Sequence, residues 1–294
     1  MRTRRLRPGP SAPGTGRPGT GRPRTGRPGT GLLGAGSLGP SLLGVALLTG
    51  CAAAAGGSSP APGPGPQAAV RGTVTVFAAA SLTDAFGTLG EQFEAEHPDV
   101  TVTFSFGASS GLAQQVLAGA PVDVFAAASP ATMATVTDAD DDAAEPQVFA
   151  RNRLAIAVPP DDPGRVRGLA DFARPELLLA LCAPEVPCGA AAAEVFAAAG
   201  ITPAPDTLEQ DVRAALSKVA LGEVDAALVY RTDVLAAGAD VRGIAFPEAD
   251  SAVNDYPVVT LEDAPNPVAA QAFVAHVLSS EGQQVLADAG FDSP

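Results

Sequence analysis

The stretch FSFGASSGL, residues 104–112, runs from a strand pattern through a glycine-rich turn into a helix. Within it, GASSG matches G-x-S-x-G, the turn that presents the nucleophilic serine of α/β-hydrolases. The same turn also fits a helix N-terminus, where free backbone N–H groups can face an anion. Ser109 is therefore a candidate nucleophile on the first interpretation and a candidate hydrogen-bond donor on the second.

The order of strand, turn and helix repeats on both sides of this stretch. Such alternation predicts an α/β fold in which mostly parallel sheets are flanked by helices. The pattern forms two runs joined near residue 150 and again near residue 255, which predicts two lobes and two crossing strands. We expect lobe 1 to comprise 72–152 plus 255–294, and lobe 2 to comprise 153–254. The predicted strands are 73–80, 99–106, 122–128, 152–159, 177–182, 224–230 and 256–261; the predicted helices are 81–97, 111–119, one after Ser129, 189–200, 211–222 and 266–290, the last interrupted near Gly282.

The charge is distributed unevenly along the chain. Residues 1–50 contain eight of the 18 Lys and Arg residues and none of the 32 Asp and Glu residues. From Cys51 onward, ten basic residues face 32 acidic ones, which gives a formal charge of −22. Nucleic-acid binding requires a basic face, so we expect no nucleic-acid partner.

The N-terminal part has the composition of an export signal. A basic segment precedes the apolar residues 32–48, and Leu48-Thr49-Gly50-Cys51 resembles the lipobox of bacterial lipoproteins. The alternative is a membrane-spanning helix with an incidental cysteine, but this apolar segment is short and broken by glycine. We expect 1–50 to be a signal peptide with a lipobox, and 51–71 to be the lipidated Cys51 followed by a flexible tether.

Cys182 and Cys188 are the two remaining cysteines. An exported chain meets oxidising surroundings, so the leading interpretation is a disulfide, and the alternative is two separate thiols. A zinc site lacks support because no histidine lies near them.

Several predicted helices begin directly after a strand. Ser81, Ser109, Cys188 and Val212 each lie at such a start, where N–H groups are free and the helix dipole is positive. In open α/β sheets ligands bind beyond the carboxyl ends of strands, so these starts can share one anion pocket without Lys or Arg. The alternative for each serine is an ordinary N-cap, and Ser81 with Asp84 has the spacing of a capping box.

A serine hydrolase would need a histidine after Ser109 in the chain. His276 is the only one, and it lies within an apolar helical pattern; His97 comes before Ser109. Neither has a glycine-rich loop to position it, so the sequence supplies no suitable general base and we expect no enzymatic activity.

Six blocks in order resemble one family. They are VTVFAAASLTDAF, FGASSGLAQQVLAGAPVDVFAAA, VPCG, DVRAAL, ALVYRTD and YPVV, and the similarity spans about residues 72–294. They resemble the periplasmic molybdate-binding proteins of ABC importers. The resemblance implies the type II periplasmic-binding fold, with two α/β lobes, two crossing strands and the oxyanion held in the cleft.

The resemblance also implies the ligand-binding residues. Ser81 and Ser109 would each donate a hydroxyl and a backbone N–H. Cys188, where the family often has Ala, and Val212 would donate backbone N–H groups, and Tyr230 would donate its phenol. A Cys182–Cys188 pair departs from the commonest family pattern and would attach a ligand loop through a disulfide.

All five positions offer donors, which suits molybdate because a dianion near neutral pH has only acceptors. Phosphate keeps a proton and would gain from an acceptor carboxylate, for which Asp123 is the nearest candidate, although it lies inside a strand pattern. Sulfate stays a competitor, and tungstate differs too little from molybdate to be separated.

We therefore expect an extracytoplasmic receptor, anchored by lipid to the outer face of the cell membrane. It would capture molybdate or tungstate and deliver the anion to an ABC transporter permease. We expect a monomer without a cofactor, and the alternatives are a receptor for sulfate or another tetrahedral oxyanion and an exported serine hydrolase that uses Ser109.

Overall fold

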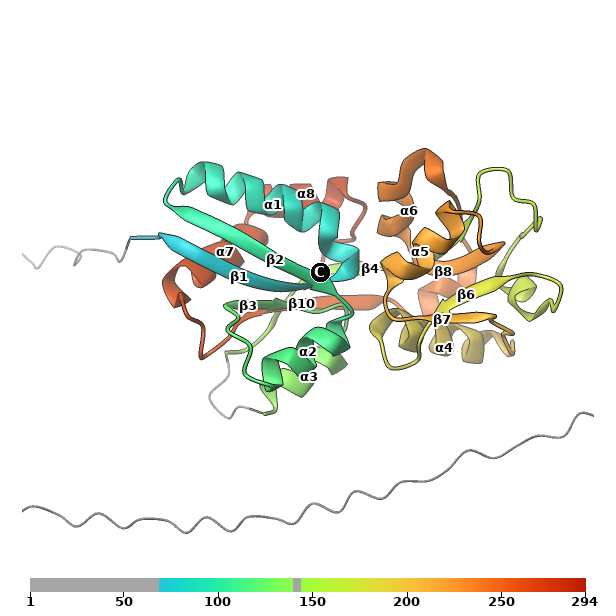
Figure 1. The fold of residues 1–294 in the computed structure, drawn as a ribbon, viewed down its shortest axis with the longest axis horizontal. Helices are drawn as coiled ribbons and strands as arrows, with labels where there is room; N and C mark the ends of the chain where they lie inside the picture. Colours follow the sequence, from blue (N-terminus) through green and yellow to red (C-terminus); the bar gives the residue numbers. More distant parts are fainter. Residues whose placement is uncertain (1–68, 140–143) are drawn as a thin grey trace, which may run out of the picture. The chain divides into compact units, whose positions relative to one another are not determined.

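The computed structural model describes residues 69–139 and 144–294 (Figure 1). The expected signal peptide 1–50, Cys51 and most of the expected tether 51–71 lie outside the described residues. Among the residues that are described, no helix has both the length and the apolar character needed to cross a membrane.

The first sheet gathers strands from the beginning and the end of the folded part. Its order is β2-β1-β3-β10-β4, in which β1 pairs in parallel with β2 and β3, and β10 pairs antiparallel with β3 and β4. We call this sheet with α1, α2, α3, α7 and α8 lobe 1 (Figure 1). Its elements are β1 (Gly72–Ala79), the 3₁₀ turn η1 (Ala80–Leu82), α1 (Thr83–Glu96), β2 (Val100–Gly107), α2 (Ser109–Leu117), β3 (Val124–Ala126), α3 (Pro130–Thr137), β4 (Gln147–Asn152), β10 (Asn254–Thr260), α7 (Pro267–Leu278) and α8 (Ser280–Asp288).

The second sheet repeats this plan with the middle of the chain. Its order is β7-β6-β8-β5-β9, with β6 parallel to β7 and β8, and β5 antiparallel to β8 and β9. We call it, with its helices, lobe 2. Its elements are β5 (Leu154–Val158), η2 (Leu169–Ala173), β6 (Leu179–Cys182), α4 (Pro187–Ala199), β7 (Thr207–Glu209), α5 (Val212–Ala220), β8 (Ala226–Tyr230), α6 (Arg231–Ala237), η3 (Gly238–Asp240), β9 (Arg242–Ile244) and η4 (Pro247–Ser251).

Both sheets are mixed, and the expectation of mostly parallel sheets was wrong in this detail. Each sheet has two parallel and two antiparallel pairings. The cause is the crossing segments: the chain leaves β4, turns at Arg153 and enters the other sheet as β5, and it returns as β10. A strand that arrives by crossing between sheets has no helical crossover behind it, so it need not run parallel to its neighbours.

The sheet of lobe 1 is covered on both faces. Neighbouring side chains in a strand point to opposite faces, so a strand of this sheet carries apolar residues in succession. Val76 of β1 packs in a cluster with Phe86, Leu89 and Phe93 of α1, as the spacing of that helix predicts. The next residue, Phe77, belongs to a separate cluster with α2 and α3. Strand β1 is thus buried on both faces.

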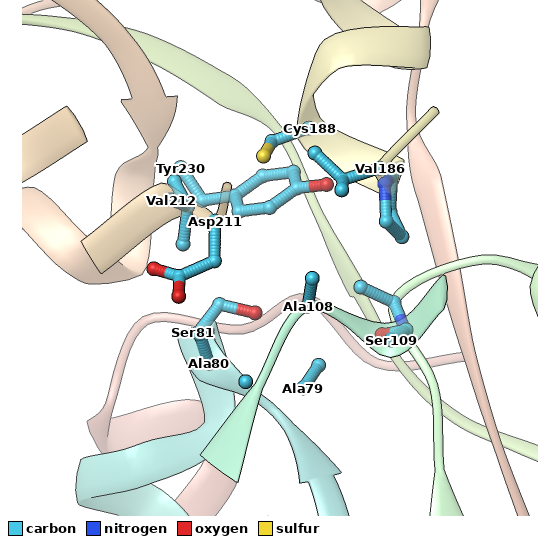
Figure 2. Close-up of a pocket in the computed structure, with 13 residues that line it drawn as sticks. Ala79, Ala80, Ser81, Ala108, Ser109, Val186, Cys188, Asp211, Val212 and Tyr230 are labelled. Atoms are coloured by element: carbon cyan, nitrogen blue, oxygen red, sulfur yellow. The ribbon is translucent and has the colours of Figure 1, made fainter. Parts of the chain in front are cut away.

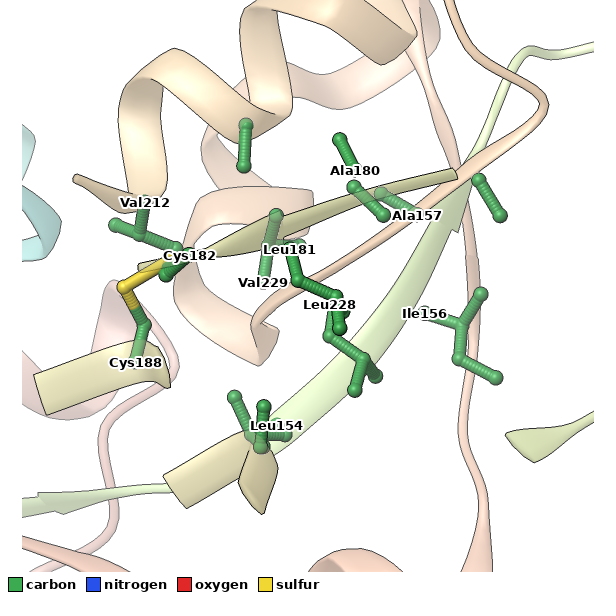
Figure 3. Close-up of a cluster of buried hydrophobic side chains, with 14 of the residues drawn as sticks. Leu154, Ile156, Ala157, Ala180, Leu181, Cys182, Cys188, Val212, Leu228 and Val229 are labelled. Carbon is green, nitrogen blue, oxygen red and sulfur yellow. A yellow bond between two sulfur atoms is a disulfide. The ribbon is translucent and has the colours of Figure 1, made fainter. Parts of the chain in front are cut away.

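Lobe 2 has one continuous core built from β5, β6 and β8 and the helices that cover them (Figure 3). Ala80 of lobe 1 belongs to this same cluster, and Ala108 packs against it. The two lobes are therefore in contact at the ends of β1 and β2.

Candidate functional site

A pocket lies where strands of both lobes pass into helices (Figure 2). It contains about 230 Å³ of empty space, part of it open to solvent. All five residues that the sequence predicted as ligand-binding line it, although they come from five separate segments. The lining residues are Ala79, Ala80, Ser81, Gly107, Ala108, Ser109, Ala128, Val186, Pro187, Cys188, Asp211, Val212 and Tyr230.

Lobe 1 supplies the two serines from neighbouring strand ends. Strands β1 and β2 run parallel and in register, so Ala79 at the end of one lies beside Gly107 at the end of the other. Each strand is followed directly by a helical segment: η1 after β1 carries Ser81, and α2 after β2 carries Ser109. Parallel pairing therefore brings together two serines that are 28 positions apart.

Lobe 2 supplies the opposite wall. Cys188 lies in the first turn of α4, Val212 is the first residue of α5, and Tyr230 is the last residue of β8. Figure 2 shows the ring of Tyr230 on one side of the pocket and Ser81 and Ser109 on the other.

Three of the helical segments that begin at the pocket lack side-chain caps at their N-termini, whereas α5 is capped by Asp211. The N-cap positions of η1, α2 and α4 are Ala79, Ala108 and Val186, and none makes a side-chain cap hydrogen bond. By contrast, Ser129 and Ser279 cap α3 and α8 elsewhere in the molecule. Because first-turn N–H groups have no partner inside a helix, the uncapped ends leave donors free at the pocket.

The expected capping box at Ser81 was wrong, because its side chain is used differently. Ser81 Oγ lies 2.8 Å from the hydroxyl of Tyr256, and the N-cap of α1, Leu82, makes no side-chain cap bond. Ser109 Oγ accepts the N–H of Ala128 at 3.0 Å. Both serines are buried, and each is held by a partner outside its own helix.

Tyr230 is 1% exposed, and its hydroxyl makes no hydrogen bond of acceptable geometry among the residues that the structure describes, although the hydroxyl of Tyr256 is near enough to influence it. A buried, unpaired hydroxyl is unfavourable unless a ligand accepts its hydrogen. Burial holds the pKa of this phenol well above its usual range, so it remains a donor at all physiological pH values. Its backbone is fixed by Asp233, whose Oδ2 accepts the Tyr230 N–H at 3.0 Å.

Asp211 was not predicted as part of the pocket. It is the N-cap of α5, and its Oδ1 accepts the N–H of Ala214 at 2.9 Å. It is the single charged side chain of the pocket lining, which contains no Lys or Arg. Asp123, the acceptor considered from sequence, lies elsewhere and accepts the N–H groups of Thr75 and Asn266. The signal for Asp211 was its place directly before Val212.

The ion pair of Arg213 joins the two lobes beside the pocket. Arg213 of α5 donates to Asp84 of α1 at 2.6 Å, and its other terminal nitrogen lies 3.9 Å from Asp233. Burial raises the pKa of the Asp233 carboxyl to about 7, and the nearby Arg213 and the Tyr230 N–H oppose that rise. The residue after Val212 thus links lobe 2 to lobe 1.

The family follows from a comparison with known proteins. The model of a family described as bacterial extracellular solute-binding protein matches residues 74–292, most of the chain. This chain belongs to the bacterial extracellular solute-binding proteins. The family accounts for the pocket between two lobes and places the solute-binding protein outside the cytoplasm.

Relatives and solved structures agree with this assignment. The solute-binding protein is 41% identical over 249 residues to the molybdate-binding protein ModA of Mycobacterium tuberculosis (strain H37Rv), covering 85% of this chain and 95% of that relative. Its fold matches the periplasmic molybdate-binding protein of Azotobacter vinelandii with a TM-score of 0.64, at 19% identity, over 75% of this chain and 99% of the other. The sulfate-binding protein SubI of M. tuberculosis matches with a TM-score of 0.65, at 19% identity, over 75% and 86%. The two-lobed periplasmic-binding fold is therefore confirmed.

The histidine that a serine hydrolase would need is not at the pocket of the solute-binding protein. No histidine is among the lining residues. His276 lies on α7, where its ring packs against Phe93 and its Nδ1 is 3.5 Å from Glu96. The bond that Ser109 Oγ does make comes from a backbone amide, which cannot act as a general base.

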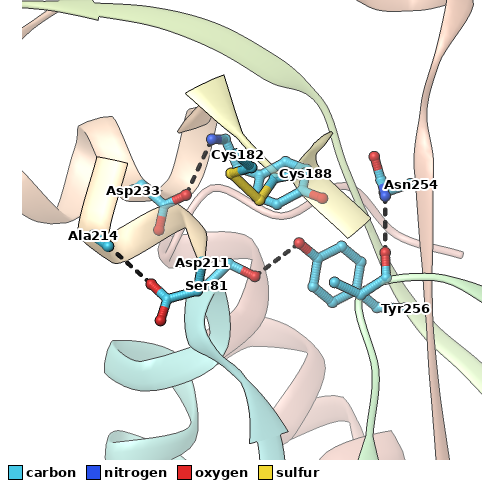
Figure 4. The surroundings of a disulfide bond; sticks show 10 residues. Ser81, Cys182, Cys188, Asp211, Ala214, Asp233, Asn254 and Tyr256 are labelled. Atoms are coloured by element: carbon cyan, nitrogen blue, oxygen red, sulfur yellow. Dashed lines mark hydrogen bonds between the residues drawn. A yellow bond between two sulfur atoms is a disulfide. The ribbon is translucent and has the colours of Figure 1, made fainter. Parts of the chain in front are cut away.

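A disulfide joins Cys182 at the end of β6 to Cys188 at the pocket (Figure 4). Their Cα atoms are 5.8 Å apart and six positions apart in sequence. The bridge holds the first turn of α4 against the strand that precedes it.

We expect reduction of this disulfide to weaken solute binding more than it destabilises lobe 2. Closing a loop this short contributes only about 2 kcal/mol to the free energy of unfolding. Reduction would in addition free the first turn of α4, which carries the backbone N–H of Cys188. Thermal unfolding and solute titration of the Cys182→Ser/Cys188→Ser variant would measure both effects. Two free thiols in protein purified from its native compartment would contradict a structural bridge.

Proposed function

We propose that this solute-binding protein captures molybdate, and also tungstate, and delivers it to an ABC transporter permease. The observation that carries the proposal is a pocket whose serines, tyrosine and helix N-termini offer donors from both lobes. Molybdate presents four oxygen acceptors and no donor, so each of its oxygens can accept hydrogen bonds from these groups. The 41% identity to a relative named molybdate-binding protein supports the same ligand.

The negative charge of the ligand would be balanced without a basic side chain. Helix N-termini carry partial positive charge, and several of them point toward one pocket. This arrangement matters here because the body of the protein is strongly acidic. Closure of the two lobes around the anion would exclude water and strengthen these donors relative to the same groups in water.

Calorimetric titration of the purified protein with molybdate, tungstate, sulfate and phosphate tests the proposal. We expect tight binding of the first two anions, weaker binding of sulfate and the weakest binding of phosphate. Sulfate is also an acceptor-only dianion, so tighter binding of sulfate than of molybdate would replace the proposed ligand with the alternative one. Binding of none of the four would overturn the proposal.

We propose further that the protein acts as a monomer without a cofactor and catalyses no reaction. Binding needs only closure of the two lobes, and the ion pair between Arg213 and Asp84 supports the closed arrangement. Each lobe contributes part of the ligand set, so one copy of the chain holds a complete pocket.

We propose that Cys51 carries the lipid that anchors the protein to the outer face of the cell membrane. Cys51→Ala is expected to release the protein from membranes or to block its processing, because acyl chains contribute about 0.8 kcal/mol per buried CH₂ to anchoring. Membrane fractionation with mass spectrometry measures this. Ala52→Ser, which retains the cysteine, serves as the control and should stay in the membrane. Retention of Cys51→Ala at the processed mass would contradict the anchor.

A further inference from the structure

The two pocket serines share a feature that their helix positions do not explain. Each side-chain oxygen is in contact with a protein group behind it: Ser109 Oγ with the N–H of Ala128 at 3.0 Å, and Ser81 Oγ with the hydroxyl of Tyr256 at 2.8 Å. An amide can only donate, so Ser109 Oγ is an acceptor in its contact. Its own hydrogen is therefore left for another partner.

Tyr256 is placed to donate a hydrogen bond to Ser81 Oγ, as the N–H of Ala128 does to Ser109 Oγ. It lies in β10, 175 positions away, is fully buried and does not line the pocket (Figure 4). The rings of Phe149, Tyr230 and Phe291 surround it with centroids 5.4 to 6.4 Å away, which fixes the direction of its hydroxyl. Burial raises its pKa, so the phenol keeps its proton.

The distance alone allows either oxygen to donate. If Ser81 donated to Tyr256, its one hydrogen would be used inside the protein, and its lone pairs would face an anion that offers lone pairs only. If Tyr256 donates, Ser81 keeps its hydrogen for the pocket. An acceptor-only ligand therefore favours the second direction.

We propose that Tyr256 is a positioning residue for oxyanion binding: it donates to Ser81 Oγ and so makes Ser81 a donor toward the ligand. This inference rests on the proposed function. It adds a selectivity rule, because both serine oxygens are already engaged as acceptors. A ligand that carries its own proton, such as hydrogen phosphate, then meets at each serine an oxygen that already accepts one hydrogen bond and directs its own hydrogen toward the pocket, so that the proton of the ligand is disfavoured there.

A double-mutant cycle tests the inference. Tyr256→Phe removes one oxygen from a buried ring and is expected to raise the Kd for molybdate about tenfold, as for a hydrogen bond to a charged group. In a Ser81→Ala background the same change should raise Kd less than about twofold. In the matched Ser109→Ala background it should retain its full effect of about tenfold, because Ser109 has a different partner.

Loss of packing would weaken binding equally in all three backgrounds, and that result would overturn the inference. A second measurement is the ratio of the Kd values for phosphate and molybdate, which Tyr256→Phe should lower about tenfold because Ser81 regains an acceptor. An unchanged ratio would also count against it. Failure of the unmodified protein to bind molybdate would instead reject the proposed function.

Discussion

Ser109→Asp is expected to abolish molybdate binding, with a loss of at least about 4 kcal/mol, or roughly a thousandfold in Kd. Ser109 is 1% exposed and is the first residue of α2. A carboxylate there would occupy the same N–H groups that the anion needs and would repel the dianion in a buried pocket. Ser109→Ala, which removes only one donor, should lose about 1–3 kcal/mol. Calorimetry measures both variants.

Ser110→Asp is the matched control, because it adds the same charge in the same helical turn but does not line the pocket. We expect it to weaken binding far less than Ser109→Asp. Equal losses would mean that the charge of the helix end, and not the position of Ser109, decides binding. A serine-directed fluorophosphonate should leave the protein unlabelled, and stoichiometric labelling at Ser109 would restore the nucleophile interpretation.

Gly189→Ala is expected to disrupt the first turn of α4, lowering the free energy of unfolding by about 3 kcal/mol and molybdate affinity at least about tenfold. An added Cβ would lie 1.9 Å from the carbonyl oxygen of Ala183 and 2.8 Å from that of Cys182. Both contacts are with backbone, which cannot move without shifting Cys188 and its N–H. Thermal unfolding and titration measure the two effects.

Gly111→Ala provides the comparison, since Gly111 is likewise the third residue of a helix that faces the pocket. Nothing lies within 4 Å of its added Cβ, so the substitution should be neutral or stabilise the helix by up to about 1 kcal/mol. Similar losses at the two glycines would show that the close contact at Gly189 is not the cause.

Most of the long, strongly patterned elements were predictable, and several of the shorter ones were not. The apolar spacing of Phe86, Leu89 and Phe93 predicted α1, and buried runs predicted the central strands. β7 and β9 have three residues each and lie at sheet edges, where little burial shapes the sequence. Several helix boundaries were also misplaced. α2 begins at Ser109 rather than at residue 111, and α4 begins at Pro187, which suits the first helical position. The last helix breaks at Ser279, which caps α8, rather than near Gly282.

The pocket residues were predictable where a local pattern marks them. Ser81, Ser109, Cys188 and Val212 follow strand ends, and that rule together with the family resemblance indicates them from the sequence. Tyr256 carries no local mark, because its role depends on a partner in another segment. The ion pair between Arg213 and Asp84 was missed for the same reason: neither residue is unusual within its own helix.

The main-chain donors that we propose at the helix starts have a consequence for how this pocket can change over generations. A side-chain donor disappears with a single codon change, but a main-chain N–H is present whichever amino acid is encoded, unless the residue becomes proline. A substitution at Cys188 or Val212 can therefore change the shape of the pocket or the solubility of the protein without removing the backbone N–H donor. Evolutionary changes in anion specificity should therefore be concentrated at Ser81, Ser109 and Tyr230. The backbone donors at the other two positions should persist through neutral drift.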